Sequence, residues 1–146
     1  MSKRYVDIKE TAALIRYELK QAFPKTQFSV RLQRYSMGSH ITVRWTDGPS
    51  VRQVEAITDQ RYGTGFDSMT DSTTHHDVEY NGEILHFAGS RPHCEREISP
   101  GFETACTKAW EALDGHERCV LLNNYKFPRW PEDRPGRRLA SFIAAP

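Results

Sequence analysis

The side chains of this sequence that are best suited to chemistry are a group of histidines and one cysteine. They are His75, His76, His86, His93 and Cys94. A hairpin that turns at Asn81-Gly82 would bring His76 beside His86, and one more turn would add Cys94. These intervals match neither the CxxC nor the HxxxH spacing of an established zinc site. We therefore expect surface histidines, a buried thiol and no cofactor. If a metal does bind, its expected ligands are His75, His76, His86 and Cys94.

A second group of reactive side chains is acidic. Asp47, Asp67, Asp71 and Asp77 are predicted to lie in turns on either side of a central helix. Paired carboxylates can hold a hard cation or transfer protons, but Asp is also the ordinary residue of turns, where it accepts hydrogen bonds from nearby backbone N–H groups. The sequence has no nucleophile elbow, phosphate loop or zincin helix. We predict turn roles for these aspartates, no catalytic residue and no enzyme activity.

The third group is suited to recognition instead of reaction. Its members are Arg31, Arg34, Tyr35, Arg44, Tyr62 and Phe66. Arg31 and Arg44 are expected on the outer face of a hairpin, with Arg34 and Tyr35 at its end. Aromatic and arginine side chains dominate the energetics of protein interfaces and also bind single-stranded nucleic acid. These residues form the predicted binding surface. A solvent-exposed strand face with no binding role would have the same pattern.

An antiparallel hairpin and a helix are expected to position that surface. Apolar residues alternate with polar ones in both predicted strands, at Phe28, Val30, Leu32, Ile41, Val43 and Trp45. Trp45 is expected in the core. Ser50 and Gln53 have the spacing of a capping box, which predicts a helix from Val51 to about Arg61. A polar turn is expected over residues 63–71.

The rest of the sequence predicts two more helices and a second hairpin. Apolar residues recur at helical spacing from Ile8 to Phe23, between an Asp7 cap and Pro24. Asn81-Gly82 is a strong hairpin signal, and the segment 93–98 is a weaker strand candidate. Ser99 is expected to cap the last helix. The buried stripe of that helix is predicted to be Phe102, Cys106, Trp110 and Leu113.

These elements predict an α+β fold in a single domain. Two antiparallel hairpins would form one small sheet, packed by three helices in the order α-β-β-α-β-β-α. We place the domain at residues 1–122. Residues 123–146, which are rich in proline and arginine, are expected to form an irregular C-terminal arm that could dock on the body.

Composition limits the classes of function. Twenty basic and nineteen acidic side chains give a formal charge of +1, which lacks the strong positive charge of a dedicated nucleic-acid binder. Three cysteines are an odd number, and the start Met-Ser-Lys-Arg-Tyr has no apolar signal region. No apolar run approaches the roughly 18 residues that span a bilayer. We expect a cytoplasmic protein that does not enter a membrane.

Several motifs together resemble a known family. Trp45-Thr46-Asp47-Gly48-Pro49, the helix after it and Phe66-Asp67-Ser68-Met69-Thr70-Asp71 resemble the twenty-ninth family of large polyvalent protein associated domains. Tyr80-Asn81-Gly82-Glu83, His86-Phe87-Ala88-Gly89 and Cys94-Glu95-Arg96-Glu97-Ile98-Ser99 resemble its second half. The likeness covers about Asp7 to Ser99.

That resemblance implies a role in a mobile genetic element. The family consists of modules encoded by phages and conjugative elements, often within very long proteins thought to enter a recipient cell with the DNA. It implies a binding protein that acts inside a bacterium on a host defence complex, such as an anti-CRISPR-type inhibitor that occupies a nuclease or surveillance complex. It supplies no agreed catalytic residues.

Two other functions stay open at this point. One is a nucleic-acid-binding accessory domain that protects or escorts incoming DNA through the sheet face and the basic C-terminal segment. The other is a metal-dependent enzyme centred on His75, His76, Asp71 and Cys94.

Overall fold

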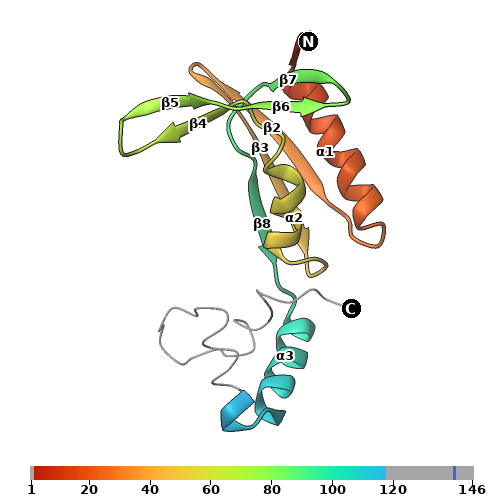
Figure 1. Ribbon diagram of the computed structural model, residues 1–146. Helices are drawn as coiled ribbons and strands as arrows, with labels where there is room; N and C mark the ends of the chain where they lie inside the picture. Colours follow the sequence, from red (N-terminus) through yellow and green to blue (C-terminus); the bar gives the residue numbers. More distant parts are fainter. Residues whose placement is uncertain (1, 118–139, 141–146) are drawn as a thin grey trace.

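The computed structural model describes residues 2–117 and Ala140, so the predicted C-terminal arm otherwise lies outside the described residues. The elements are β1 (Lys3–Val6), α1 (Ile8–Ala22), β2 (Ser29–Tyr35), β3 (Gly38–Thr46), α2 (Val51–Thr58), β4 (Thr64–Asp67), β5 (Ser72–His75), β6 (Asp77–Tyr80), β7 (Glu83–Phe87), β8 (His93–Glu97) and α3 (Pro100–Ala112), as Figure 1 shows. The predicted α+β class is confirmed.

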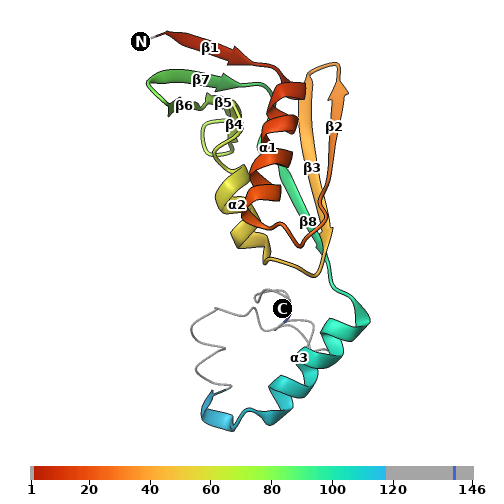
Figure 2. The ribbon, with the colours of Figure 1, turned by 90° about the vertical axis from the view of Figure 1, so that its right-hand side faces the viewer.

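The main core lies between helices α1 and α2 and the sheet β2-β3-β8 (Figure 2). β2 and β3 pair antiparallel with Val30 opposite Val43, as the alternation predicts, and β8 adds a parallel strand beside β3. Trp45 is buried, as predicted, and its indole Nε1 donates a hydrogen bond to the carbonyl oxygen of Pro49 at 2.9 Å. The core residues are Ile8, Ala12, Ile15, Leu19, Val30, Ile41, Val43, Trp45, Val54 and Ala88.

The helix caps follow the sequence signals. The Asp7 side chain caps α1 by accepting a hydrogen bond from the backbone N–H of Lys9. The capping box of Ser50 and Gln53 begins α2, which ends at Thr58 and not at Arg61. Ser99 caps α3, as predicted. α3 buries Cys106, whereas Phe102, Trp110 and Leu113 are only half-buried.

The second half of the chain departs from the single predicted sheet. The predicted hairpin at Asn81-Gly82 forms β6 and β7, but it pairs with β1 in the separate sheet β1-β7-β6. β1 was not predicted because only Val6 of its four residues is buried, which leaves no alternating apolar pattern. Residues 63–71, expected as a polar turn, include β4 instead, and β4 pairs with β5 over Thr64–His75. β5 is exposed throughout and β4 is mostly half-buried, with no fully buried residue in either strand, so backbone pairing forms them without a periodic apolar signal.

Backbone hydrogen bonds at Gly89 and Ser90 form a junction between the β4–β5 hairpin and the rest of the domain. The carbonyl oxygen of Gly89 accepts hydrogen bonds from the N–H groups of Gly63 at 3.1 Å and Thr64 at 3.2 Å. The neighbouring Ser90 N–H donates to the carbonyl oxygen of Ser39, on β3, at 3.1 Å. The β2–β3 and β4–β5 hairpins are therefore both hydrogen-bonded to one segment, Gly89-Ser90, which we call their shared anchor.

α3 begins where β8 ends and lies apart from the two main sheets in Figure 1. The Asp47 carboxylate, at the end of β3, accepts hydrogen bonds from the N–H of Ser99 at 2.7 Å and from its hydroxyl at 2.6 Å. The start of α3 is thereby tied to the first sheet. Within residues 2–117, no helix is long and apolar enough to cross a bilayer.

We expect Gly63→Ala to destabilise the fold strongly. A Cβ atom at this position would lie 1.8 Å from the carbonyl oxygen of Phe87, so the backbone would have to move. Overpacking of this kind costs about 2 kcal/mol or more of the free energy of unfolding. Urea titration monitored by circular dichroism measures it. Gly101→Ala is the control, because its Cβ would meet nothing within 4 Å. Equal stability of the two variants would contradict the assigned role of Gly63.

Candidate binding surface

The structure spreads the predicted binding residues over two hairpins. Arg31, Arg34 and Tyr35 lie on β2 and Arg44 lies on β3. Phe66 lies on β4, and Tyr62 lies just before that strand. Backbone hydrogen bonds at Gly89 and Ser90 link the two sets. The predicted binding residues therefore lie on two hairpins and not on one continuous sheet face.

The arginines of the first hairpin are largely neutralised within the chain. Arg44 forms an ion pair with Glu95, its register neighbour on β8, and this hydrogen bond lowers the pKa of the Glu95 carboxyl. Arg34 lies 3.4 Å from the Asp7 carboxylate. Arg31 has no ion-pair partner among the described residues. A phosphate backbone would thus meet few uncompensated cations on this face.

Large apolar side chains are exposed near the ends of both hairpins. Tyr35 is 51% exposed and Met37 is 93% exposed at the β2–β3 end. Phe66 is 67% exposed and Met69 is 92% exposed at the β4–β5 end. We call these four residues the hairpin-tip surface. Sequence reasoning missed Met37 and Met69 because a methionine within a polar turn has no periodic pattern; an apolar residue between turn-forming residues was the available signal.

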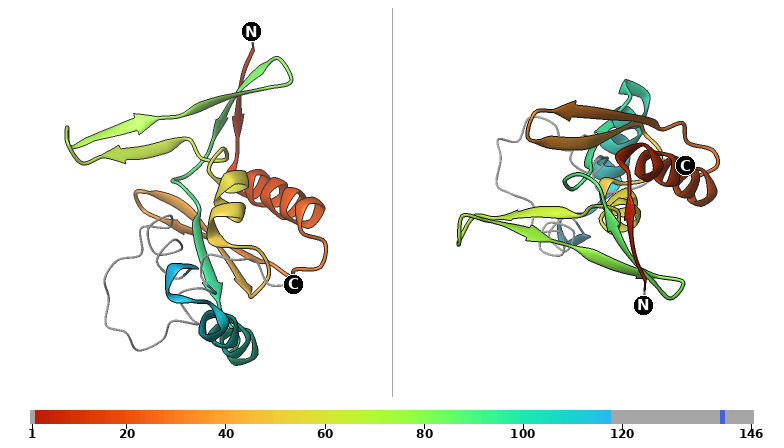
Figure 3. Two further views of the ribbon diagram at one scale, coloured as in Figure 1. Left: turned by 60° about the horizontal axis from the view of Figure 1, so that its bottom comes forward. Right: turned by 90° about the horizontal axis from the view of Figure 1, so that it is seen from above.

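Both tips project from the same side of the body. The two hairpins extend to the left in Figure 1 and again point in a common direction in both views of Figure 3. The β4–β5 hairpin is hydrogen-bonded to Gly89 at its base, through Gly63 and Thr64, whereas the β2–β3 hairpin is bonded to Ser90 through Ser39, next to its turn. Each tip thus presents exposed apolar side chains, as interaction surfaces do.

The turn between β4 and β5 is held by its own side chains. The Asp67 carboxylate accepts hydrogen bonds from the N–H of Met69 and from the hydroxyl of Thr70, both at 2.9 Å. The Met69 hydrogen bond, followed by that of Thr70, lowers the pKa of Asp67. Asp71 adopts a left-handed turn conformation with φ of 49°. The predicted turn roles of Asp67 and Asp71 are confirmed, and Met69 is presented on a defined loop.

The structure does not gather the predicted metal ligands. His76 stacks on Tyr62, with ring centroids 4.8 Å apart, whereas the rings of His75 and His86 lie 6.0 Å from each other. The Cys94 thiol lies elsewhere, 3.5 Å from the Thr58 hydroxyl, and its burial raises its pKa. Over residues 2–117 and 140, no group of three or more histidine, cysteine or acidic side chains could hold a metal ion.

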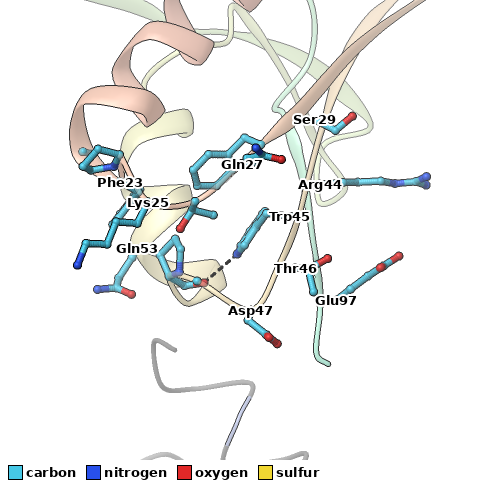
Figure 4. Close-up of a pocket in the computed structure, with 16 residues that line it drawn as sticks. Phe23, Lys25, Gln27, Ser29, Arg44, Trp45, Thr46, Asp47, Gln53 and Glu97 are labelled. Carbon is cyan, nitrogen blue, oxygen red and sulfur yellow. Dashed lines mark hydrogen bonds between the residues drawn. The ribbon is translucent and has the colours of Figure 1, made fainter. Parts of the chain in front are cut away.

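A hollow lies at the opposite end of the first sheet from the β2–β3 tip. It has a volume of about 910 Å³ and is lined by the loop after α1 together with Trp45 and the turn that follows β3 (Figure 4). Its lining contains no histidine or cysteine, and both carboxylate oxygens of Asp47 are already bonded to Ser99. A second carboxylate, Glu97, also lines the hollow.

Comparison with known proteins gives one match. The model of a family described as large polyvalent protein associated domain 29 matches residues 6–99. The chain belongs to this family. No curated protein and no solved structure matches the chain. Within this large polyvalent protein associated domain, the matched region contains both hairpins and their anchor at Gly89-Ser90, whereas α3 lies outside it.

Asp77 differs from the other aspartates of this domain because it forms cross-strand contacts. Its carboxylate lies 2.8 Å from the Lys3 ammonium and 2.7 Å from Nδ1 of His86. The hydrogen bond from Lys3, followed by that from His86, lowers the pKa of Asp77 below its usual value. The predicted turn role of Asp77 is therefore wrong; it ties β1 and β7 to β6.

We expect Asp77→Asn to destabilise the domain at neutral pH and to have little effect in strong acid. A carboxyl group whose pKa is lower in the folded state stabilises that state above its unfolded pKa, near 4. This stabilisation is lost as the pH falls through the folded pKa. Urea midpoints of both proteins, measured between pH 7 and pH 2, test this. Glu79→Gln, an exposed change on the same strand, should show no such difference. A gap of equal size at both ends of the pH range would contradict the prediction.

Proposed function

We propose that this protein is a binding protein of a phage or plasmid that counters a host defence system by occupying a protein surface. The hairpin-tip surface is the observation that carries the proposal. Tyr35, Met37, Phe66 and Met69 are 51% to 93% exposed on two hairpins that share one anchor. Inhibition by occupation requires such a surface and no catalytic group.

The chemistry of the tips favours a protein partner with an apolar site. Methionine is flexible and polarisable, so Met37 and Met69 can fill irregular hollows, and the aromatic rings of Tyr35 and Phe66 bury large areas at low entropic cost. Two separated tips can also contact a partner at two points, and each tip then adds to the affinity of the other. The side-chain hydrogen bonds of Asp67 hold one tip in place before binding, which lowers the cost of ordering it.

The charge distribution argues against nucleic acid as the partner of this surface. Residues 64–75, which form the β4–β5 hairpin, contain Asp67 and Asp71 and no lysine or arginine. On the other hairpin, Arg34 and Arg44 are paired with Asp7 and Glu95. Binding to a phosphate backbone depends on uncompensated cations. An apolar protein surface fits these tips better.

Membership of this family supports the proposed role in a phage or plasmid that enters a bacterial host. Modules that resemble this one are carried by phages and conjugative elements and act after DNA entry, when host nucleases are the immediate threat. A nuclease or surveillance complex, such as a CRISPR effector, is therefore the proposed target class. The protein would act in the cytoplasm of the bacterial host.

The proposal is tested by the establishment of a targeted plasmid in matched strains with and without one defence system. Expression of the full chain should raise establishment only in the defended strain, and the purified chain should bind the purified defence complex. Met37→Ser combined with Phe66→Ser should weaken that binding by about thirtyfold, because a truncated interface hot spot typically costs about 2 kcal/mol. Equal establishment with and without the chain, over the defence systems tried, would reject the proposal.

Tyr17→Ser provides the matched control for the tip variants. Tyr17 is 63% exposed but lies on α1, away from the tips, so its replacement should leave protection unchanged. Each variant changes exposed side chains, and the free energy of unfolding should stay within about 0.5 kcal/mol of the wild type. A salt series separates the alternative partner: affinity for an apolar protein site changes little with salt, whereas affinity for nucleic acid falls steeply.

A further inference from the structure

A separate hollow lies on the sheet β1-β7-β6, away from the tip residues. It has a volume of about 600 Å³ and is lined by Lys3, Tyr5, His75 and His86. These residues come from three strands, β1, β5 and β7, that are brought together where the β5 and β6 segments run on from one another (Figures 1 and 3). The size is within the range of sites that bind small ligands.

The register of the sheet places its key side chains in one row. Tyr5 pairs with His86 across β1 and β7, and His86 pairs with Asp77 across β7 and β6. Side chains of directly paired residues lie on the same face of a sheet. The Tyr5 and His86 rings are 5.9 Å apart and 28° from parallel, and the His75 ring lies 6.0 Å from that of His86. A group of aromatic rings therefore borders the hollow, and Tyr5 is 65% exposed.

Asp77 positions two of the lining side chains, Lys3 and His86. One carboxylate oxygen lies 2.7 Å from Nδ1 of His86, and the other lies 2.8 Å from the Lys3 ammonium. Both oxygens are thus engaged, and no carboxylate lines the hollow itself. The Lys3 ammonium has three N–H donors and gives one to Asp77, so the others can reach a ligand. Lys3 and His75 therefore have N–H donors left for a ligand, whereas Nδ1 of His86 is engaged by Asp77.

We propose that this hollow binds a nucleoside phosphate. The base stacks on the exposed Tyr5 ring, and the phosphate oxygens accept hydrogen bonds from Lys3 and His75. An exposed aromatic ring next to the N–H groups of Lys3 and His75 matches a ligand that is flat at one end and anionic at the other. Because the Lys3 charge is balanced by Asp77, these groups contribute hydrogen bonds and not net positive charge. The same chemistry is present in a free mononucleotide and in the phosphorylated end of a single strand. The proposal does not depend on the counter-defence role.

Calorimetric titration of the full chain with adenosine 5′-monophosphate tests the site. We expect saturable binding, and binding at least about tenfold weaker for adenosine alone and for inorganic phosphate alone, because each lacks one half of the interaction. Absence of saturable binding of the monophosphate, or inorganic phosphate binding as tightly as the monophosphate, would overturn the proposal.

Tyr5 is exposed, so its replacement should change ligand binding without affecting folding. Tyr5→Ala should weaken binding of the monophosphate by about tenfold, whereas Tyr5→Phe, which retains the stacking ring, should bind like the wild type. Tyr17→Ala is the matched control, because Tyr17 is similarly exposed, at 63%, but lies on α1. Unchanged affinity in Tyr5→Ala, or equal loss in Tyr5→Ala and Tyr17→Ala, would contradict the assignment.

The two sources of the ligand are separated by oligonucleotides. A short single strand with a 5′-phosphate that binds more tightly than the monophosphate, and more tightly than the same strand without its phosphate, identifies a strand end as the ligand. Tighter binding of the monophosphate identifies a free nucleotide. Either result supports the site only when Tyr5→Ala weakens it.

Discussion

The close passage of Gly63 against the carbonyl group of Phe87 is the constraint on which the second half of this protein depends. Any side chain at Gly63 would overlap the Phe87 carbonyl oxygen. The contact allows the N–H groups of Gly63 and Thr64 to reach Gly89, and the His76 N–H to reach Gly63. Through these backbone bonds the β4–β5 hairpin is held on the body. Both proposed sites depend on this junction, since it positions Phe66 in one and His75 in the other.

The protein combines a well-packed half with a half built from backbone pairing. Helices α1 and α2 bury apolar side chains against β2-β3-β8, and this core supplies most of the hydrophobic stabilisation. β4 and β5 have no fully buried residue and depend on their ladder and on the junction. Regions with few buried contacts open more easily than a core. The packed core of α1, α2 and β2-β3-β8 thus supports the β4–β5 hairpin, which is exposed to partners.

The proposed sites suit different ligands because different side chains are left unsatisfied at each. At the hairpin tips the exposed groups are apolar, and the nearby Arg34 and Arg44 are paired within the chain. At the hollow the exposed groups are a phenol ring and hydrogen-bond donors, arranged by one fully engaged carboxylate, Asp77. Lys3 at the hollow is also paired, so the two sites differ in the exposed groups that remain, which are apolar at the tips and hydrogen-bonding at the hollow.

The sequence by itself determined the elements that bury one face: α1, β2, β3 and α3, with Trp45 in the core. Periodic burial leaves a periodic pattern of residue types, and caps such as Ser50 and Ser99 mark the helix ends. Tertiary structure alone decided that the two hairpins lie in different sheets and that β1, β4 and β5 are strands. It also placed Tyr5 beside His86. These features come from backbone pairing between distant segments, which any residue type can supply, so the sequence has no local pattern that reports them.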